Sequence, residues 1–130
     1  MSALRVPERI IKEILVENSF KNVKEDEKIV GFEFKIRNTL GSGTIDSVYV
    51  FKVDEEMYSP DQIIIIKGKE ERKGSTITAS NPLYVDYGDV ITLRFLREGG
   101  LKPGKHKVEG SLGIMGIGTV TITFELEMKE

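Results

Sequence analysis

Within residues 28–37, apolar side chains recur at every second position from Val30 onward, and this alternation constrains the fold more than any other feature of the sequence. The apolar positions are Val30, Phe32, Phe34 and Ile36. A repeat of two residues is typical of a β-strand with one buried face and does not fit a helix. The sequence therefore predicts a half-buried strand over Lys28–Arg37.

Further strand patterns follow, separated by turn signals. We expect strands over Ile45–Val53, Ile63–Ile66, Ser75–Ala79, Val90–Arg97 and on both sides of the glycine-rich stretch 113–118. The apolar run Val48–Phe51 suggests cover on both faces of its strand. Eight or nine strands with at most one short helix predict an all-β protein. Its expected architecture is an antiparallel β-sandwich, immunoglobulin-like or jelly-roll-like.

Residues 7–16 are the one segment whose secondary structure stays open. Its apolar positions have helical spacing, and Pro7 suits the first turn of a helix. The family resemblance described below favours instead a strand from about Ile14 to Val23.

Length and composition limit the class of protein. The 130 residues fit one domain, which we expect to span residues 1–130. The 19 basic and 21 acidic residues are interleaved and leave a net charge of −2, so we expect no nucleic-acid partner. Cysteine is absent, which excludes disulfides and thiolate chemistry. Without an apolar run of signal-peptide or membrane-span length, we expect a cytoplasmic protein with no membrane partner.

His106 is the only histidine and the one tempting candidate for a functional residue. The turn dipeptide Pro103-Gly104 places it at the start of a strand. General-base work needs an orienting carboxylate or a nucleophile beside the ring, and no sequence pattern supplies either. A packed sheet residue is the better interpretation, so we expect no catalytic residue in this chain.

No pattern of metal or cofactor ligands is recognisable. One histidine without cysteine nearly excludes zinc, and the acidic clusters 25–27, 54–56 and 70–71 lack the spacing of a calcium loop. The glycines at 41, 43, 113, 116 and 118 are not followed by the helix that a dinucleotide site requires. We expect turn glycines, and neither a cofactor nor a metal in this chain.

Five separated segments, in this order and spacing, resemble one family. They are Asn18–Val23, Lys28–Arg37, Lys52–Glu56, Tyr87–Asp89 and Gly99–Val108. Together they are similar to the small, or β, subunit of bacterial C-glycoside deglycosidases and its uncharacterised relatives. The resemblance spans about residues 18–112.

The resemblance implies a β-sandwich that pairs with a larger TIM-barrel subunit. In that family the larger subunit is similar to sugar isomerases and carries a divalent metal and the acid–base residues. The resemblance therefore implies a non-catalytic small subunit of a two-component sugar-modifying or C-glycoside-cleaving enzyme. Because the family's loop after the arginine is distinctive, Arg37, Asn38, Gly41 and Gly43 are the candidate partner interface.

Two other classes remain open from the residues alone. One is a self-contained ligand-binding or homo-oligomeric sandwich, which would use exposed edge strands and tyrosines. The other is an independent enzyme that uses His106.

Overall fold

Two β-sheets make up most of the part of the chain that the structure, a computed structural model, describes: residues 4–129. Sheet A consists of β1 (Leu4–Val6), β4 (Gly43–Val53), β5 (Glu56–Tyr58), β8 (Leu83–Val85), β10 (Gly104–Ile114) and β11 (Gly118–Met128). Sheet B consists of β2 (Lys21–Glu25), β3 (Lys28–Arg37), β6 (Ile63–Lys67), β7 (Glu70–Lys73) and β9 (Val90–Leu96). Two short 3-10 helices occupy Pro60–Gln62 and Gly74–Thr76, and the one α-helix is α1 (Glu8–Ile14).

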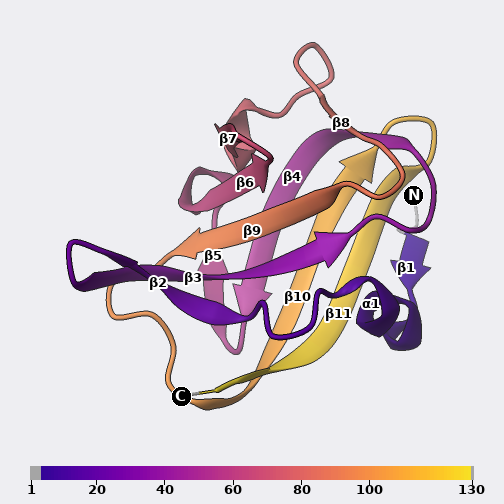
Figure 1. Ribbon diagram of the computed structural model, residues 1–130. Helices are drawn as coiled ribbons and strands as arrows, with labels where there is room; N and C mark the ends of the chain where they lie inside the picture. The colour runs from indigo at the N-terminus through magenta and orange to yellow at the C-terminus, as the bar shows by residue number, and fades with distance from the viewer. Residues whose placement is uncertain (1–3, 130) are drawn as a thin grey trace.

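The sheets lie one in front of the other, with β3 and β9 crossing over β4, β10 and β11 (Figure 1). Sheet A runs in the order β1-β11-β10-β4-β5, with β8 also paired to β4, and sheet B in the order β2-β3-β9-β6-β7. All pairings are antiparallel except that of β1, which lies parallel to β11. The predicted all-β sandwich is confirmed.

The core between the sheets is aromatic at its centre. Phe95 of β9 stacks on Phe32 and Phe34 of β3, with ring centroids 5.0 and 5.8 Å apart. Phe51 of β4 meets Phe95 from the opposite sheet at 5.5 Å. The predicted strand over Lys28–Arg37 is confirmed with those bounds, and its apolar face is the buried one.

Eleven strands are present in residues 4–129, rather than the eight or nine expected. The sequence analysis missed β1, β7 and β8, which have only three or four residues each. The expected strand over Ser75–Ala79 is wrong, because its first residues belong to a 3-10 helix. Such short segments become strands through pairing with distant partners, which their own sequence does not reveal.

Within residues 7–16, residues 8–14 form a helix rather than a strand. The helix α1 begins after Pro7 and buries Ile11 and Ile14, in agreement with the helical spacing of the apolar positions. The alternative strand from about Ile14 is wrong, because β2 begins only at Lys21. Leu15 makes a single bridge to Ile36 and no strand.

The prediction that both faces of Val48–Phe51 are covered is wrong, because a bulge in β4 exposes two of these residues. Val48 and Phe51 are buried, whereas Tyr49 and Val50 are 44% and 46% exposed. The register with β10 shifts between Gly110 and Leu112, opposite this stretch. The shift places one extra residue in β4 relative to β10, so two consecutive side chains of β4 point outward.

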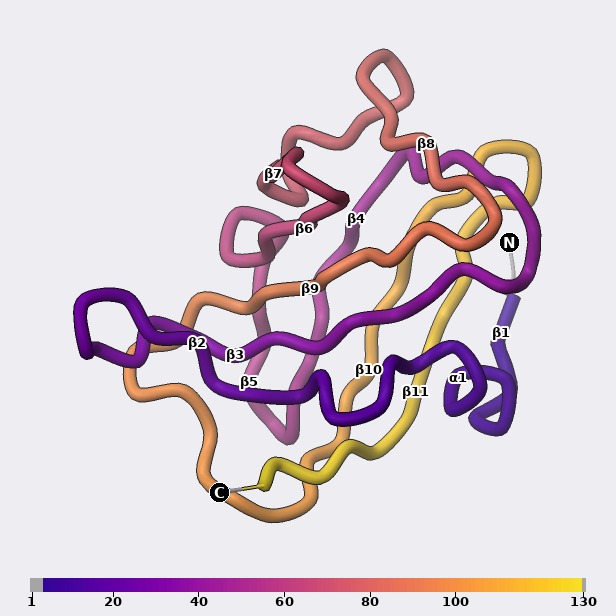
Figure 2. The backbone as a smooth tube through the Cα atoms, viewed as in Figure 1, coloured from indigo at the N-terminus to yellow at the C-terminus, as the bar shows by residue number. Residues whose placement is uncertain are grey.

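The sandwich has two ends with different connections (Figure 2). At one end lie the β3–β4 loop and the β10–β11 turn, joined by the Met115 N–H and the Thr44 carbonyl at 2.9 Å. At the other end lie the β4–β5 turn and the start of β10, where the Asp54 N–H donates to the Lys107 carbonyl at 2.8 Å. We call these the loop end and the hairpin end.

Candidate functional site

The loop end is organised around Asn38. Its side-chain amide donates to the Gly41 carbonyl at 2.7 Å and to the Asp86 carbonyl at 3.1 Å. Its side-chain oxygen accepts from the Leu40 N–H at 3.2 Å, and its backbone exchanges hydrogen bonds with Gly88 and Asp89. One short polar side chain therefore fixes the β3–β4 loop against the β8–β9 loop.

A cavity of about 330 Å³ opens at the loop end and runs between the two sheets. Sheet A contributes Val6, Val48, Leu112, Ile114 and Val120 among others, and sheet B contributes Ile36, Ile65, Ile91 and Leu93. Asn38 and Ser42 are the only polar side chains among the described residues that line it, and no charged residue does. This apolar cavity is a space that the core side chains do not fill.

Exposed apolar side chains gather around the same end. Residues 4–129 contain ten large exposed hydrophobic residues, and six of them lie here: Leu4, Leu40, Tyr84, Tyr87, Met115 and Ile117. Leu4, Leu40 and Ile117 border the apolar cavity directly and are 56%, 63% and 62% exposed. We call these three residues the rim. Exposed apolar groups that cluster in this way mark an interaction surface more often than chance scatter does.

The four predicted interface residues lie in or beside this end. Asn38, Gly41 and Gly43 line the apolar cavity, and Gly41 has a φ of 130° that favours glycine. Arg37 is exposed at the end of β3 and does not line the cavity. The sequence analysis did not find the rim, because Leu4 and Ile117 are far from the loop in sequence and reach it only through folding.

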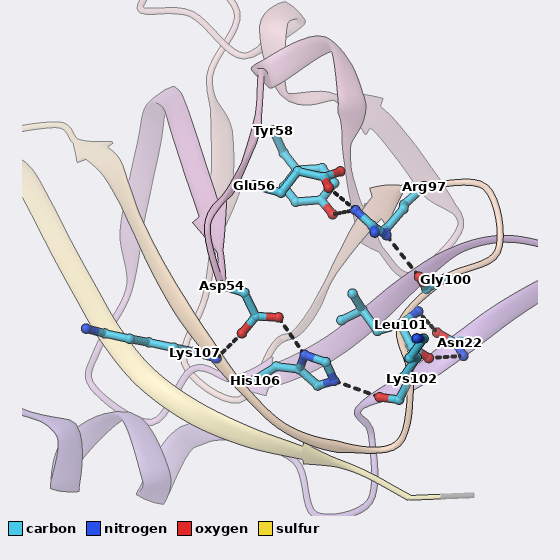
Figure 3. Close-up of polar contacts among 10 residues, drawn as sticks. All are labelled: Asn22, Asp54, Glu56, Tyr58, Arg97, Gly100, Leu101, Lys102, His106 and Lys107. Atoms are coloured by element: carbon cyan, nitrogen blue, oxygen red, sulfur yellow. Dashed lines mark hydrogen bonds and ion pairs between the residues drawn. The ribbon is translucent and has the colours of Figure 1, made fainter.

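His106 lies at the hairpin end in a polar cluster (Figure 3). Its Nδ1 is 2.7 Å from a carboxylate oxygen of Asp54, and its Nε2 is 2.7 Å from the Lys102 carbonyl. Both partners are hydrogen-bond acceptors, and the imidazole ring bridges them. The side chain is 11% exposed and its ring meets Phe20 edge-on at 6.0 Å. His106 thus lies near the start of β10, where the turn dipeptide predicts it, and its structural role stays a prediction.

Arg97 organises the neighbouring part of the hairpin end. Its guanidinium forms an ion pair with Glu56 and donates to the Tyr58 hydroxyl at 3.2 Å and to the Gly100 carbonyl at 3.0 Å. Asn22 then holds Leu101 through two 2.9 Å hydrogen bonds, one to its carbonyl and one from its N–H. The cluster ties β2, β5 and the β9–β10 connection together.

The electrostatics of this cluster favour ion pairing. Burial alone would raise the pKa of Asp54, but hydrogen bonds from His106 and the Lys107 N–H outweigh it and hold that pKa below its ordinary value. The hydrogen bond from Arg97 likewise lowers the pKa of Glu56. Burial raises the pKa of the Tyr58 phenol, which makes that group a weaker acid.

The contacts of this cluster hold the hairpin end together. Both nitrogens of His106 lie within hydrogen-bond distance of acceptors in the chain, so in this arrangement neither faces a substrate. The sequence analysis missed the carboxylate beside His106, because Asp54 is 52 residues away. The available signal was that Asn22, Asp54, Glu56 and His106 all belong to segments of the family resemblance. Within residues 4–129, no group of three or more histidine or acidic side chains is placed to hold a metal ion.

Comparison with known proteins adds one strong match. A family model described as C-glycoside deglycosidase beta subunit matches residues 10–115. No curated protein matches the chain. Among solved structures, the N-terminal domain of PorA is similar over 88% of this chain and 90% of its own length, with 17% identity and a TM-score of 0.34. Within the described residues, no helix has the length and apolarity to cross a membrane.

The matched range contains the elements described above. It includes α1 from its third residue onward, every strand of sheet B, the Asn38 loop and both halves of the Asp54–His106 pair, and it reaches the β10–β11 turn. Because the match covers most of the sequence, the chain belongs to the family of C-glycoside deglycosidase beta subunits.

Proposed function

We propose that this chain is the non-catalytic subunit of a cytoplasmic two-component enzyme that cleaves C-glycosides or modifies related sugar conjugates. A larger TIM-barrel subunit holds the divalent metal ion and the acid–base residues, and this sandwich supports it. Family membership supports the existence of a partner subunit. The structural observation that carries the proposal is the gathering of exposed apolar side chains at the loop end. A protein subunit that buries them removes this apolar area from water.

The test uses the chain in its own host. The protein carries an affinity tag after residue 130 and is purified gently, and partners recovered in fixed stoichiometry are identified by mass spectrometry. We expect a larger TIM-barrel protein. Elemental analysis of the separated subunits should then place the divalent metal in the larger one.

An assay of C-glycoside cleavage completes the test. The two subunits are incubated with a C-glycoside, separately and together, and release of the aglycone is followed by chromatography. We expect cleavage by the mixture, reduced or absent cleavage by the larger subunit alone, and none by this chain alone. Recovery of a lone monomer or homo-oligomer, or cleavage by this chain alone, would contradict the proposal.

The apolar cavity favours one second candidate, a self-contained binding protein. Calorimetry on the isolated chain separates the two ideas. The subunit proposal expects no heat when sugars or C-glycosides are added to the isolated chain, whereas a self-contained sugar-binding protein would release or absorb heat.

A further inference from the structure

We infer that the apolar cavity is a socket that receives an uncharged, apolar protrusion of the larger subunit, and that the rim of Leu4, Leu40 and Ile117 packs around the base of that protrusion. This inference rests on the proposed function for the existence of the larger subunit. It adds the surface that binds the subunit and the chemistry of the segment that enters.

The lining determines which chemistry can enter. Within residues 4–129, no charged side chain lines the apolar cavity, and the walls are almost entirely aliphatic. A charged or strongly polar group would lose its hydration there without gaining a partner, whereas an apolar side chain is transferred favourably. The entering segment therefore presents apolar side chains such as leucine, methionine or phenylalanine.

The size of the space fits side chains of a protein. A cavity of 150 Å³ lined by aliphatic and aromatic residues accommodates a benzene ring. The apolar cavity, at about 330 Å³, has room for roughly two such groups. One or two neighbouring side chains from a loop or helix end would fill it.

Two observations favour a protein over a small molecule as the occupant. Small-molecule sites usually contain a few free polar groups that orient the ligand. Here the lining has only two polar side chains within residues 4–129, Asn38 and Ser42, and the amide of Asn38 is already engaged with Gly41, Val85 and Asp86. In addition, a small molecule inside the apolar cavity would leave the rim in water, whereas a protein surface over the opening would bury the rim and the walls together.

A second copy of this chain fits less well. In a two-fold dimer the same patch of each copy faces its counterpart. Two openings that face each other bring the rims together but leave both spaces empty, and proteins rarely tolerate such voids. An asymmetric partner with a protrusion fills the space.

The hairpin end offers a contrasting surface. Its exposed hydrophobic residue Met57 is 66% exposed, but it lies between charged groups, with Glu55 and Glu56 before it and Arg97 paired to Glu56. Met57 therefore provides a matched control, equally exposed and apolar but at the opposite end of the sandwich.

The first experiment measures the affinity of the purified larger subunit, recovered as described above, for variants of this chain. Leu40→Asp and Ile117→Asp place a charge on the rim and should weaken binding about tenfold or more, as expected for central interface residues. Met57→Asp should change the affinity by less than about twofold. All three positions are exposed, and thermal unfolding of each isolated variant checks that it folds.

A second variant separates the apolar cavity from the rim. Gly43 and Ile45 lie on the same face of β4, and a Cβ on Gly43 would meet only a methyl group of Ile114, at 3.9 Å. Gly43→Val therefore fills part of the space without a clash. It should raise the unfolding temperature of the isolated chain and yet weaken binding of the larger subunit. A general loss of folding cannot produce this combination.

The outcomes distinguish the two proposals. Absence of a larger subunit overturns both. A stable complex that Met57→Asp weakens and the rim variants leave unchanged overturns only the socket. Rim variants that dissociate a homodimer, or an apolar small molecule that native mass spectrometry detects in the isolated chain, overturn the assignment of the occupant.

Discussion

The carboxylate of Asp54 joins two strands that are far apart in sequence, because it accepts hydrogen bonds from Nδ1 of His106 at 2.7 Å and from the Lys107 N–H at 3.0 Å. Asp54 itself has a φ of 57°, an unusual conformation for a residue other than glycine. Its side-chain contacts hold the β4–β5 turn against the start of β10. We interpret the Asp54–His106 pair as a structural contact that stabilises the hairpin end.

Replacement of His106 tests that interpretation. His106→Gln removes the aromatic ring and the paired donors, and should lower the free energy of unfolding by about 1–2 kcal/mol. Activity of the assembled enzyme should be retained once the variant is folded. Urea unfolding and the aglycone-release assay measure the two effects, with Lys105→Gln as the exposed neighbouring control. Loss of activity at unchanged stability would show that His106 is a catalytic residue.

Acidification should weaken the hairpin end. Because the pKa values of Asp54 and Glu56 are lowered in the folded chain, the unfolded chain binds protons more readily. Their stabilising contribution is therefore present at neutral pH and is lost as the pH falls below about 4. Thermal unfolding from pH 7 to pH 3 should show a smaller acid-induced decrease in Asp54→Asn than in the unchanged chain. An equal acid-induced decrease in unfolding temperature in both proteins would contradict the assignment of this effect to Asp54.

A buried ion pair on sheet B should contribute more to stability than a surface pair on sheet A. Glu33 is 3% exposed and accepts from Arg94 at 2.8 Å, and Lys35 lies 3.6 Å from its second oxygen. Glu33→Ala leaves these cations without their partner and should cost roughly 2–3 kcal/mol of unfolding free energy. Glu109→Ala, which breaks an exposed pair with Lys107, should cost at most about 0.5 kcal/mol. Chemical denaturation of both variants gives the comparison.

Asn38 should control the shape of the loop end. Asn38→Ala removes the side-chain bonds to Gly41, Leu40 and Asp86, and should lower the free energy of unfolding by about 1–2 kcal/mol. Hydrogen exchange should become faster at residues 38–43 and 86–89 and stay unchanged near Asp54. The neighbouring Thr39→Ala is the control. Unchanged exchange in the β3–β4 loop would show that Asn38 does not fix it.

Gly110 should not tolerate a side chain. A Cβ at this position would lie 2.3 Å from ring atoms of Phe51, which is fully buried in the core. Gly110→Ala should therefore displace the ring and cost about 1–3 kcal/mol, as overpacked cores do. Ser111→Ala, the adjacent change, should cost less. Near-ultraviolet circular dichroism and thermal unfolding report the displaced ring and the lost stability.

Alternation in the sequence was sufficient to predict the long central strands. The period of two in β3 is also visible in β9, and both strands lie where the sequence placed them, within one residue. The same alternation assigned Glu33 correctly to the face opposite Phe32 and Phe34. It did not indicate that Glu33 is buried, because its closest ionic partner, Arg94, comes from β9.

The candidate sites were less accessible to sequence reasoning. Asn38, Gly41 and Gly43 could be singled out because they are contiguous, but the apolar cavity beside them requires both sheets to be placed. Likewise, the Asp54–His106 pair depends on the register of β4 against β10, which includes a bulge that no local pattern revealed. Contacts between distant segments are properties of the fold rather than of any single stretch.

The parallel pairing of β1 with β11 has a consequence for synthesis. Leu4, Arg5 and Val6 pair with residues 120–122, so β1 has no strand partner until those residues have been translated. Val6 forms part of the apolar cavity wall, and Val120 faces the same space. A nascent chain on the ribosome therefore lacks this part of the cavity wall until β11 has been synthesised.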